Sequence, residues 1–255
     1  MSFVIALAGK GGVGKTTVAG MLVKYMKHKG MTPILAVDAD PNANLNEVLG
    51  LPVDDTLGQA REDMKKGVVP QGMTKDTFIE MRMEQAVAEA DGYDLIVMGQ
   101  PEGSGCYCAA NSLLARFLEK LSDNYAYIIM DNEAGMEHIS RLTTKNVDVL
   151  LIVADTSRRA IQAAGRIDKL ARELAIGVKK SYLILNMAKG DLTDQMRETV
   201  ASEGLNLAGV IPDDAAVTDY DMAGKPTVKL PDESPSMAAA FKIFDAVFSG
   251  NGGKP

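Results

Sequence analysis

The sequence predicts an α/β fold: a doubly wound, mostly parallel sheet with helices on both faces. Short apolar runs alternate with helix-like segments along most of the chain, which is the pattern of βαβ units. The length of 255 residues suits one large domain of this class, and 46% hydrophobic residues can supply its core. We therefore expect residues 1–255 to form a single domain.

Seven apolar runs are expected to form the buried strands of this sheet. They cover residues 3–8, 33–37, 95–98, 126–130, 149–153, 182–185 and 207–211. The spacing of apolar residues between and after them predicts helices at about 15–29, 110–122, 136–145, 157–174, 192–202, 213–223 and 234–248. The last helix carries a stripe that indicates docking on the core, made of Met237, Phe241, Phe244 and Phe248.

Residues 51–91 interrupt the alternation. No strand is expected there, and the polar sequence predicts two helices around residues 67–72. The segment holds four of the fifteen methionines, Met64, Met73, Met81 and Met83. Methionine fills irregular cores and also forms adaptable binding surfaces, so we interpret 51–91 as a helical insertion that faces a partner. The glycine-rich tail 249–255 is expected to be mobile.

The composition excludes several classes of function. Lys and Arg number 27 against 34 Asp and Glu, a net charge of −7, which argues against a chain that coats nucleic acid or anionic lipid. No apolar stretch approaches the length of a membrane span, and the N-terminus lacks the positive start of a secretory signal. Two cysteines suit a reducing compartment. We expect a cytoplasmic protein with no nucleic-acid or membrane partner.

Residues 9–17 read Gly-Lys-Gly-Gly-Val-Gly-Lys-Thr-Thr; they follow the first predicted strand and open the first predicted helix. They fit the phosphate-loop pattern GxxxxGK[ST] of P-loop NTPases. The residues expected to turn backbone N–H groups toward the phosphates are Gly11, Gly12, Val13 and Gly14. Lys15 should reach the β- and γ-phosphates, Thr16 should bind Mg²⁺, and Thr17 should contact the α-phosphate. A glycine-rich turn without a ligand is the alternative.

Lys10, directly after Gly9, gives the loop its "deviant" form, GKGGVGKTT. This loop resembles that of the MinD/ParA/nitrogenase-iron-protein group of P-loop ATPases, which implies hydrolysis of ATP to ADP with Mg²⁺. In that group the extra lysine reaches the nucleotide of a second subunit. The resemblance therefore implies a homodimer in which Lys10 is catalytic, because a cation stabilises charge on the transferring phosphoryl group. A solvated loop lysine is the alternative.

Three aspartates follow predicted strands at the carboxyl edge, where parallel sheets bind ligands. The resemblance assigns Asp40 to orienting the attacking water and Asp38 to the outer shell of Mg²⁺, although either could instead cap the helix that follows. Asp131 ends an apolar run, the Walker B arrangement in which a carboxylate holds Mg²⁺ through water. A turn aspartate is the alternative there.

A candidate adenine site lies nearer the C-terminus. Asn186 ends the run 182–185, and its amide could bind the adenine edge. Pro212 and Asp213 lie in a segment that resembles the family loop that packs on the base. A strand-end asparagine that only shapes a turn is the alternative.

Cys106 and Cys108 form a C-x-C pair in a Gly-Ser-Gly loop before a predicted helix. A helix N-terminus favours the thiolate, the form that binds metal. Two sulfurs are too few for a closed site, but a twofold dimer supplies four. Such a set suits Zn²⁺, Ni²⁺ or an iron–sulfur cluster. A redox disulfide, packing cysteines and adventitious zinc are the alternatives.

The C-x-C setting resembles the CooC-type nickel-insertion ATPases, maturation factors of carbon monoxide dehydrogenase and acetyl-CoA synthase. That resemblance implies a metallochaperone with nickel at the dimer interface and a nickel enzyme as client. An iron–sulfur scaffold or electron donor like nitrogenase iron protein is the second hypothesis. Against it, Ala134 stands where that protein has its second cluster cysteine. A MinD/ParA-like partitioning ATPase is the third, and the negative net charge opposes it.

Overall fold

The computed structural model describes residues 2–42, 44–100, 114–116, 118–133, 146–174 and 177–249. Eight strands form one sheet in the order β3-β4-β2-β5-β1-β6-β7-β8, and every neighbouring pair is parallel except β3 and β4. The strands are β1 (Phe3–Gly9), β2 (Ile34–Ala39), β3 (Val87–Ala90), β4 (Tyr93–Val97), β5 (Tyr127–Asn132), β6 (Val149–Ala154), β7 (Lys180–Ala188) and β8 (Leu207–Pro212).

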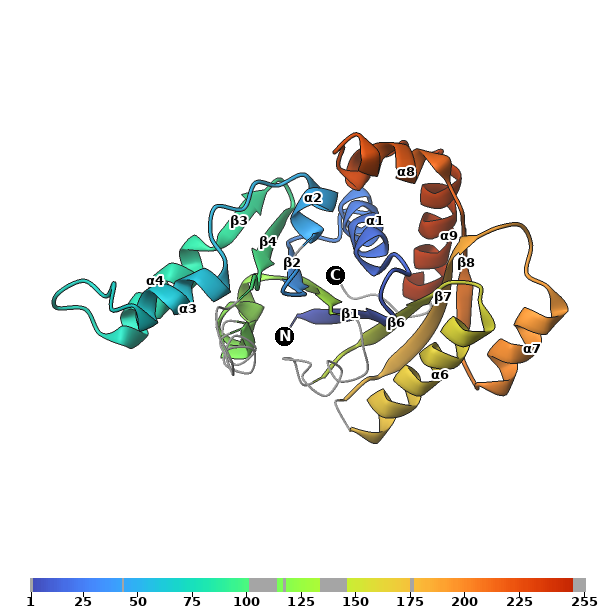
Figure 1. Ribbon diagram of the computed structural model, residues 1–255, viewed down its shortest axis with the longest axis horizontal. Coiled ribbons are helices and arrows are strands. Elements are labelled where there is room, and N and C mark those ends of the chain that lie inside the picture. The colour runs from blue at the N-terminus through green and yellow to red at the C-terminus, as the bar shows by residue number, and fades with distance from the viewer. Residues whose placement is uncertain are drawn as a thin grey trace.

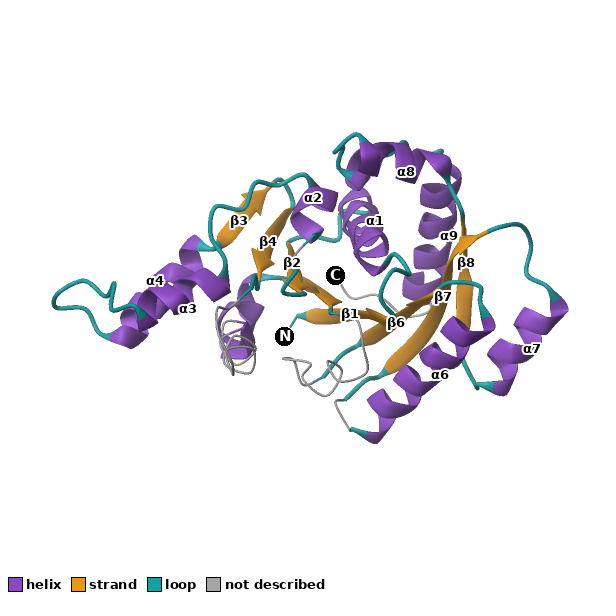
Figure 2. Ribbon diagram, viewed as in Figure 1, coloured by secondary structure: helices purple, strands orange, loops and turns teal. Residues whose placement is uncertain are grey.

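Helices cover both faces of this sheet, as predicted (Figures 1 and 2). They are α1 (Lys15–His28), α2 (Leu45–Leu49), α3 (Leu57–Lys65), α4 (Lys75–Gln85), α6 (Arg158–Glu173), α7 (Asp194–Ser202), α8 (Ala215–Met222) and α9 (Pro235–Ser249). Single-turn 3₁₀ helices cover Ser122–Asn124 and Thr227–Lys229 (η3). No helix among the described residues is long and apolar enough to cross a bilayer.

The alternation of side chains along β1 divides the core into two layers. Ile5 and Leu7 belong to the cluster that contains α1 and α9, whereas Ala6 belongs to the cluster that contains α6. The predicted apolar stripe of the last helix packs on the first of these layers. Its Phe244 is fully buried, with its ring 5.4 Å from that of Tyr25 in α1.

All seven predicted strands are present, but the expectation of a strand-free segment at 51–91 was wrong. β3 lies inside it and pairs antiparallel with β4 at the edge of the sheet. The two strands are joined by Asp91 and Gly92, and Gly92 has φ +84°. An Asp-Gly pair is a strong hairpin signal, but β3 itself reads Val-Ala-Glu-Ala, with little strand preference.

The two helices predicted in this segment are α3 and α4, which form a hairpin that extends away from the sheet (Figure 1). The helix predicted at 136–145 lies outside the described residues. Of the helix predicted at 110–122, residues 114–116 and 118–121 are described and helical. The tail was expected to begin at Ser249, but α9 includes that residue; residues 250–255 lie outside the described part.

Candidate functional site

The phosphate loop connects the end of β1 to the start of α1, as the motif predicts. Two of its glycines have left-handed backbone: Gly12 has φ +77° and Gly14 has φ +82°. A Cβ at Gly12 would meet nothing within 4 Å, whereas a Cβ at Gly14 would lie 2.4 Å from Nδ2 of Asn186. Gly14 is therefore required both by backbone conformation and by the close approach of β7.

Asn186 is buried, and its side chain is directed into the phosphate loop. Its Nδ2 donates a hydrogen bond of 2.9 Å to the carbonyl oxygen of Val13. This bond fixes the loop to the end of β7, two segments that are 173 residues apart in the sequence. The amide nitrogen is thus already used, and binding of the adenine edge by Asn186 stays a prediction.

Lys15 lies at the centre of a group of carboxylates. Its ammonium is buried and donates a bond of 3.4 Å to the carbonyl oxygen of Lys10. Burial lowers the pKa of Lys15, and the negative charges of Asp131, Asp40 and Glu133 partly oppose that shift. Lys10 is exposed, so it is accessible to a second molecule.

Asp131, at the end of β5, is 2% exposed and lies in register with Leu7 of β1 and Asp38 of β2. Burial raises its pKa to about 7, and the nearby charge of Asp38 adds to the rise. The Thr16 hydroxyl hydrogen-bonds the carboxylate and opposes the shift. Its Oδ1 is buried with no hydrogen-bond partner among the described residues.

Asp38 is 1% exposed and binds the start of α2. Its Oδ2 accepts a bond of 2.9 Å from the backbone N–H of Leu45, the first residue of that helix. Its Oδ1 accepts a bond of 3.1 Å from the backbone N–H of Asp40. Burial raises the pKa of Asp38 to about 6, and these N–H bonds hold it lower than burial alone would. Asp38 thus holds the start of α2, and its role in the outer shell of Mg²⁺ stays a prediction.

These side chains fit a magnesium ion. The unpartnered Oδ1 of Asp131 is a buried oxygen next to the Thr16 hydroxyl, and Asp38 adds a second carboxylate. Mg²⁺ prefers hard oxygen ligands and commonly takes one or two from protein, with phosphates and water completing its shell. Among the described residues no group of three His, Cys, Asp or Glu side chains could hold a metal by itself.

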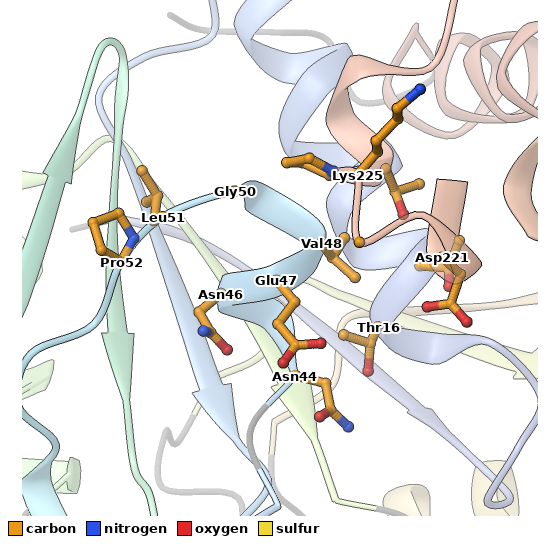
Figure 3. A pocket seen from close by; sticks show the side chains of 14 residues that line it. Thr16, Asn44, Asn46, Glu47, Val48, Gly50, Leu51, Pro52, Asp221 and Lys225 are labelled. Atoms are coloured by element: carbon orange, nitrogen blue, oxygen red, sulfur yellow. The ribbon is translucent and has the colours of Figure 1, made fainter. Parts of the chain in front are cut away.

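A cavity of about 880 Å³ opens beside the first turn of α1 (Figure 3). Thr16 and Thr17 line it from α1, Asn44 and Glu47 line it from the α2 segment, and Asp221 lines it from α8. Asn186, Pro212 and Asp213 are not among its lining residues. The cavity therefore gives access to the start of α1 from the α2 side, and the residues of the predicted adenine site do not line it.

Pro212 and Asp213 lie at the end of β8, next to β7. The backbone N–H of Asp213 donates a bond of 2.9 Å to the carbonyl oxygen of Ala188. Asp214 then caps α8 through Ala216 and accepts bonds from Ser236 at the start of α9. The segment expected to pack on the base is thus held beside the phosphate loop through β7.

Cys106 and Cys108 lie outside the described residues, but the chain leading to them is described. The backbone N–H of Gly58, in the first turn of α3, donates a bond of 2.8 Å to the carbonyl oxygen of Met98. Gly99 has φ +66°, and a Cβ there would lie 2.5 Å from Oγ1 of Thr56, the N-cap of α3. The insertion therefore packs directly on the entry to the cysteine loop.

The same insertion contacts the helical residues 118–121, which follow the cysteine loop in the sequence. The ammonium of Lys120 lies 3.4 Å from carboxylate oxygens of both Glu80 and Glu84 in α4. The α3–α4 hairpin is thus fixed to the described chain on both sides of residues 101–113.

Sequence reasoning missed two contributors to this site. Helix α2 has only five residues, too few for a helical repeat of apolar residues, although Asn44 and Glu47 have the spacing of a capping box. Asn132, the residue after Asp131, is buried and donates a bond of 2.9 Å to the carbonyl oxygen of Leu7. Nothing in the local sequence around Asn132 indicated this bond between β5 and β1.

Comparisons with known proteins agree with this geometry. The model of the CobQ/CobB/MinD/ParA nucleotide-binding domain matches residues 4–228. An uncharacterised ATP-binding protein of Methanocaldococcus jannaschii is 42% identical over 235 residues, which cover 91% of this chain and 92% of that protein. The carbon monoxide dehydrogenase accessory protein CooC of Rhodospirillum rubrum is 34% identical over 240 residues, which cover 86% and 87%. The septum site-determining protein MinD of Pyrococcus horikoshii, complexed with Mg-ADP, has a TM-score of 0.73 at 23% identity, with coverage of 99% and 98%.

Proposed function

Because the chain belongs to the CobQ/CobB/MinD/ParA family of P-loop ATPases, we propose that it is a nickel metallochaperone whose ATPase cycle controls a homodimer. The dimer acts in the cytoplasm, holds one nickel ion between its subunits and supports nickel insertion into a client enzyme such as carbon monoxide dehydrogenase or acetyl-CoA synthase. The observation that carries the proposal is 34% identity to CooC along most of both chains, in a sequence that also has the C-x-C pair Cys106 and Cys108.

The nucleotide site of this proposal consists of Lys15, Thr16, Asp38 and Asp131. Thr16 would hold Mg²⁺ directly, and the two aspartates would hold it through water. Bound Mg²⁺ supplies positive charge that neutralises the phosphate oxygens. Lys15 is already placed among the carboxylates by burial and by its bond to the loop backbone. Its ammonium would bind the β- and γ-phosphates with little further ordering of the side chain.

Hydrolysis in this proposal needs two further residues. Asp40 follows Asp38 at the same edge and would orient the attacking water. Lys10 is exposed on the phosphate loop, so a second subunit that approaches this edge would receive its ammonium at the transferring phosphoryl group. Each subunit then completes the catalytic site of the other, which makes hydrolysis depend on dimer formation.

The nickel cargo would be bound by four thiolates, two from each subunit. A change in the nucleotide could reach them through the sheet, because Asp38 lies in β2, β2 pairs with β4, and β4 precedes the cysteine loop in the sequence. The backbone N–H of Met98 donates a bond of 2.9 Å to the carbonyl oxygen of Asp38. Movement of the Asp38 segment on hydrolysis would therefore act on the residues that lead into the cysteine loop.

Nickel titration tests this function. The wild-type protein, purified anaerobically, is titrated with Ni²⁺ in the presence of ATP, ADP or no nucleotide. Cys106→Ser and Cys108→Ser are titrated in parallel. We expect tight nickel binding by the wild type and its loss in both variants, with ADP affinity retained as the control for folding. Nickel affinity that survives both substitutions contradicts the proposal. A broad visible absorption band after reconstitution with iron and sulfide, together with weak nickel binding, would instead favour the iron–sulfur hypothesis.

A further inference from the structure

The exposed face of α6 carries a row of positive side chains, which we call the basic stripe. It consists of four exposed residues, Arg158, Arg159, Arg166 and Lys169. Residues seven, eight and eleven positions apart fall on the same face of a helix, and the opposite face of α6 is buried in the protein. The helix has 16 residues and is therefore about 24 Å long. The chain that carries this stripe has a net charge of −7.

The basic stripe does not stabilise the helix on which it lies. Arg158 and Arg159 are the first two residues of α6, where the positive end of the helix dipole disfavours cations. The guanidinium groups of Arg158, Arg159 and Arg166 make no ion pair or hydrogen bond with the residues that the structure describes. The Lys169 ammonium lies 3.8 Å from the Glu173 carboxylate, an exposed pair that contributes little stability. The stripe therefore calls for an explanation outside the folding of this domain.

The side chains of the stripe suit the binding of carboxylates. The planar guanidinium of arginine donates two parallel hydrogen bonds to one carboxylate and is more weakly hydrated than an ammonium. Arginine is accordingly enriched at protein–protein interfaces, whereas lysine is depleted there. Three of the four residues of the stripe are arginines. The stripe is therefore complementary, in charge and in geometry, to a protein surface that presents carboxylates.

Nucleic acid and lipid fit this surface less well. Helix α7 lies beside α6 (Figure 1) and carries Asp194 and Glu198, which are both exposed. A nucleic-acid backbone is negative along its whole length, so these carboxylates and the net charge of the chain would repel it. Helices that bind a lipid surface insert apolar side chains, but Ile161 and Ile167 of α6 are buried in the protein. A protein partner can instead place its carboxylates on the stripe alone.

A cavity of about 630 Å³ opens between α6 and α7 at the start of the stripe. Arg158 lines it from α6, and Thr193, Gln195 and Thr199 line it from α7. Their hydroxyl and amide groups can hydrogen-bond a side chain of a partner. Glu198 lines the cavity as well, so a carboxylate is attracted only to its α6 side. Interfaces gain much of their affinity where one side chain fills a pocket of the partner, and this cavity offers such a pocket.

We propose that the exposed face of α6 docks a partner protein through carboxylates that the partner presents on one helix or loop. The inference goes beyond nucleotide and nickel binding and depends on neither. Helix α6 follows β6, and β6 pairs in parallel with β1. The stripe therefore begins at the edge of the sheet that also carries the phosphate loop, and the docked partner lies close to the nucleotide edge of the subunit.

An acidic helical peptide tests this surface. The probe has about 20 residues with glutamate along one face, and its binding at low salt is followed by fluorescence anisotropy beside a peptide with glutamine at the same positions. Arg159→Glu combined with Arg166→Glu should weaken binding of the acidic peptide at least about 10-fold, because two attractive contacts become repulsive. Lys75→Glu combined with Lys242→Glu changes the net charge equally at exposed positions outside α6 and should keep the affinity within about twofold.

Carbodiimide crosslinking locates the bound peptide, because it joins a carboxylate to an ammonium that it contacts. We expect a crosslink to Lys169, and Lys169→Arg should retain the affinity but lose that crosslink. The Arg159→Glu, Arg166→Glu variant should not lose Tm, because an acidic residue is favourable in the first turn of a helix. A loss of peptide affinity with an unchanged Tm then belongs to the surface and not to the fold.

Equal binding of the glutamine peptide, or an equal loss of affinity in the Lys75→Glu, Lys242→Glu variant, would overturn the inference. Duplex DNA or phosphatidylserine vesicles that bind more tightly than the acidic peptide, and lose binding in the Arg159→Glu, Arg166→Glu variant, would overturn it as well. The stripe would then belong to a nucleic acid or to a lipid surface.

Discussion

Asp131→Asn should stabilise the protein in the absence of nucleotide and metal, although it removes a proposed magnesium ligand. The pKa of Asp131 rises from its ordinary 3.8 to about 7, mainly through burial. Between pH 4 and 7 the folded protein therefore keeps a proton on Asp131 that the unfolded chain has released. As the pH rises through that range, the free energy of unfolding decreases, because the folded protein must bury a charged carboxylate. Above pH 7 the cost is complete, at most about 4 kcal/mol of the free energy of unfolding.

Asparagine has the same shape, carries no charge, and can still accept the hydrogen bond from Thr16. At pH 8, in EDTA and without nucleotide, we expect Asp131→Asn to raise Tm, by at most about 8–16 °C for a cost of at most about 4 kcal/mol, given about 2–4 °C per kcal/mol for a chain of this size. The difference should shrink as the pH falls toward 4, and Mg-ADP should stabilise the wild type more than the variant. Asp40→Asn, at a partly exposed carboxylate of the same group, is the control and should change Tm little.

The assay is thermal unfolding followed by circular dichroism at several pH values. A Tm of Asp131→Asn at or below that of wild type at pH 8 would refute the reasoning. A Tm difference that does not depend on pH would refute it as well, because the effect would then not come from the buried charge.

Three further predictions concern the loop and the insertion. Lys10→Ala should lower kcat for ATP hydrolysis at least about 100-fold and leave ADP affinity within about threefold; retained turnover would remove Lys10 from catalysis. Gly14→Ala should lower the free energy of unfolding in urea by more than about 2 kcal/mol, because its Cβ would meet Asn186. Gly12→Ala should lower it by only about 1 kcal/mol, from backbone strain alone. Equal losses in the two variants would contradict the close approach of Asn186 to Gly14. Gly99→Ala should displace the N-cap of α3 and weaken nickel binding without changing ADP binding; unchanged nickel affinity would separate the insertion from the cysteine loop.

The sheet, with helices on both of its faces, could be predicted from the sequence because buried parallel strands appear as continuous apolar runs. The phosphate loop was predictable for a different reason, because each of its residue types is needed for a particular contact with phosphate or Mg²⁺. β3 was missed because an edge strand can be polar and short, so its pattern is weak. The Asp-Gly pair before β4 was the signal that could have found it.

The rest of the site could not be predicted because it depends on contacts between distant segments. Asn186 could be placed at a strand end, but its bond to Val13 depends on how β7 approaches the phosphate loop. The same holds for Asp38, whose bond to Leu45 depends on a five-residue helix.

Native mass spectrometry of the anaerobically purified protein, with nickel and a non-hydrolysable ATP analogue, tests the central proposal most directly. We predict a dimer that carries two nucleotides and a single nickel ion, and a dimer without nickel when Cys106 and Cys108 are both replaced by serine. A monomer under every ligand condition, or one nickel ion bound by each separate subunit, would contradict the account.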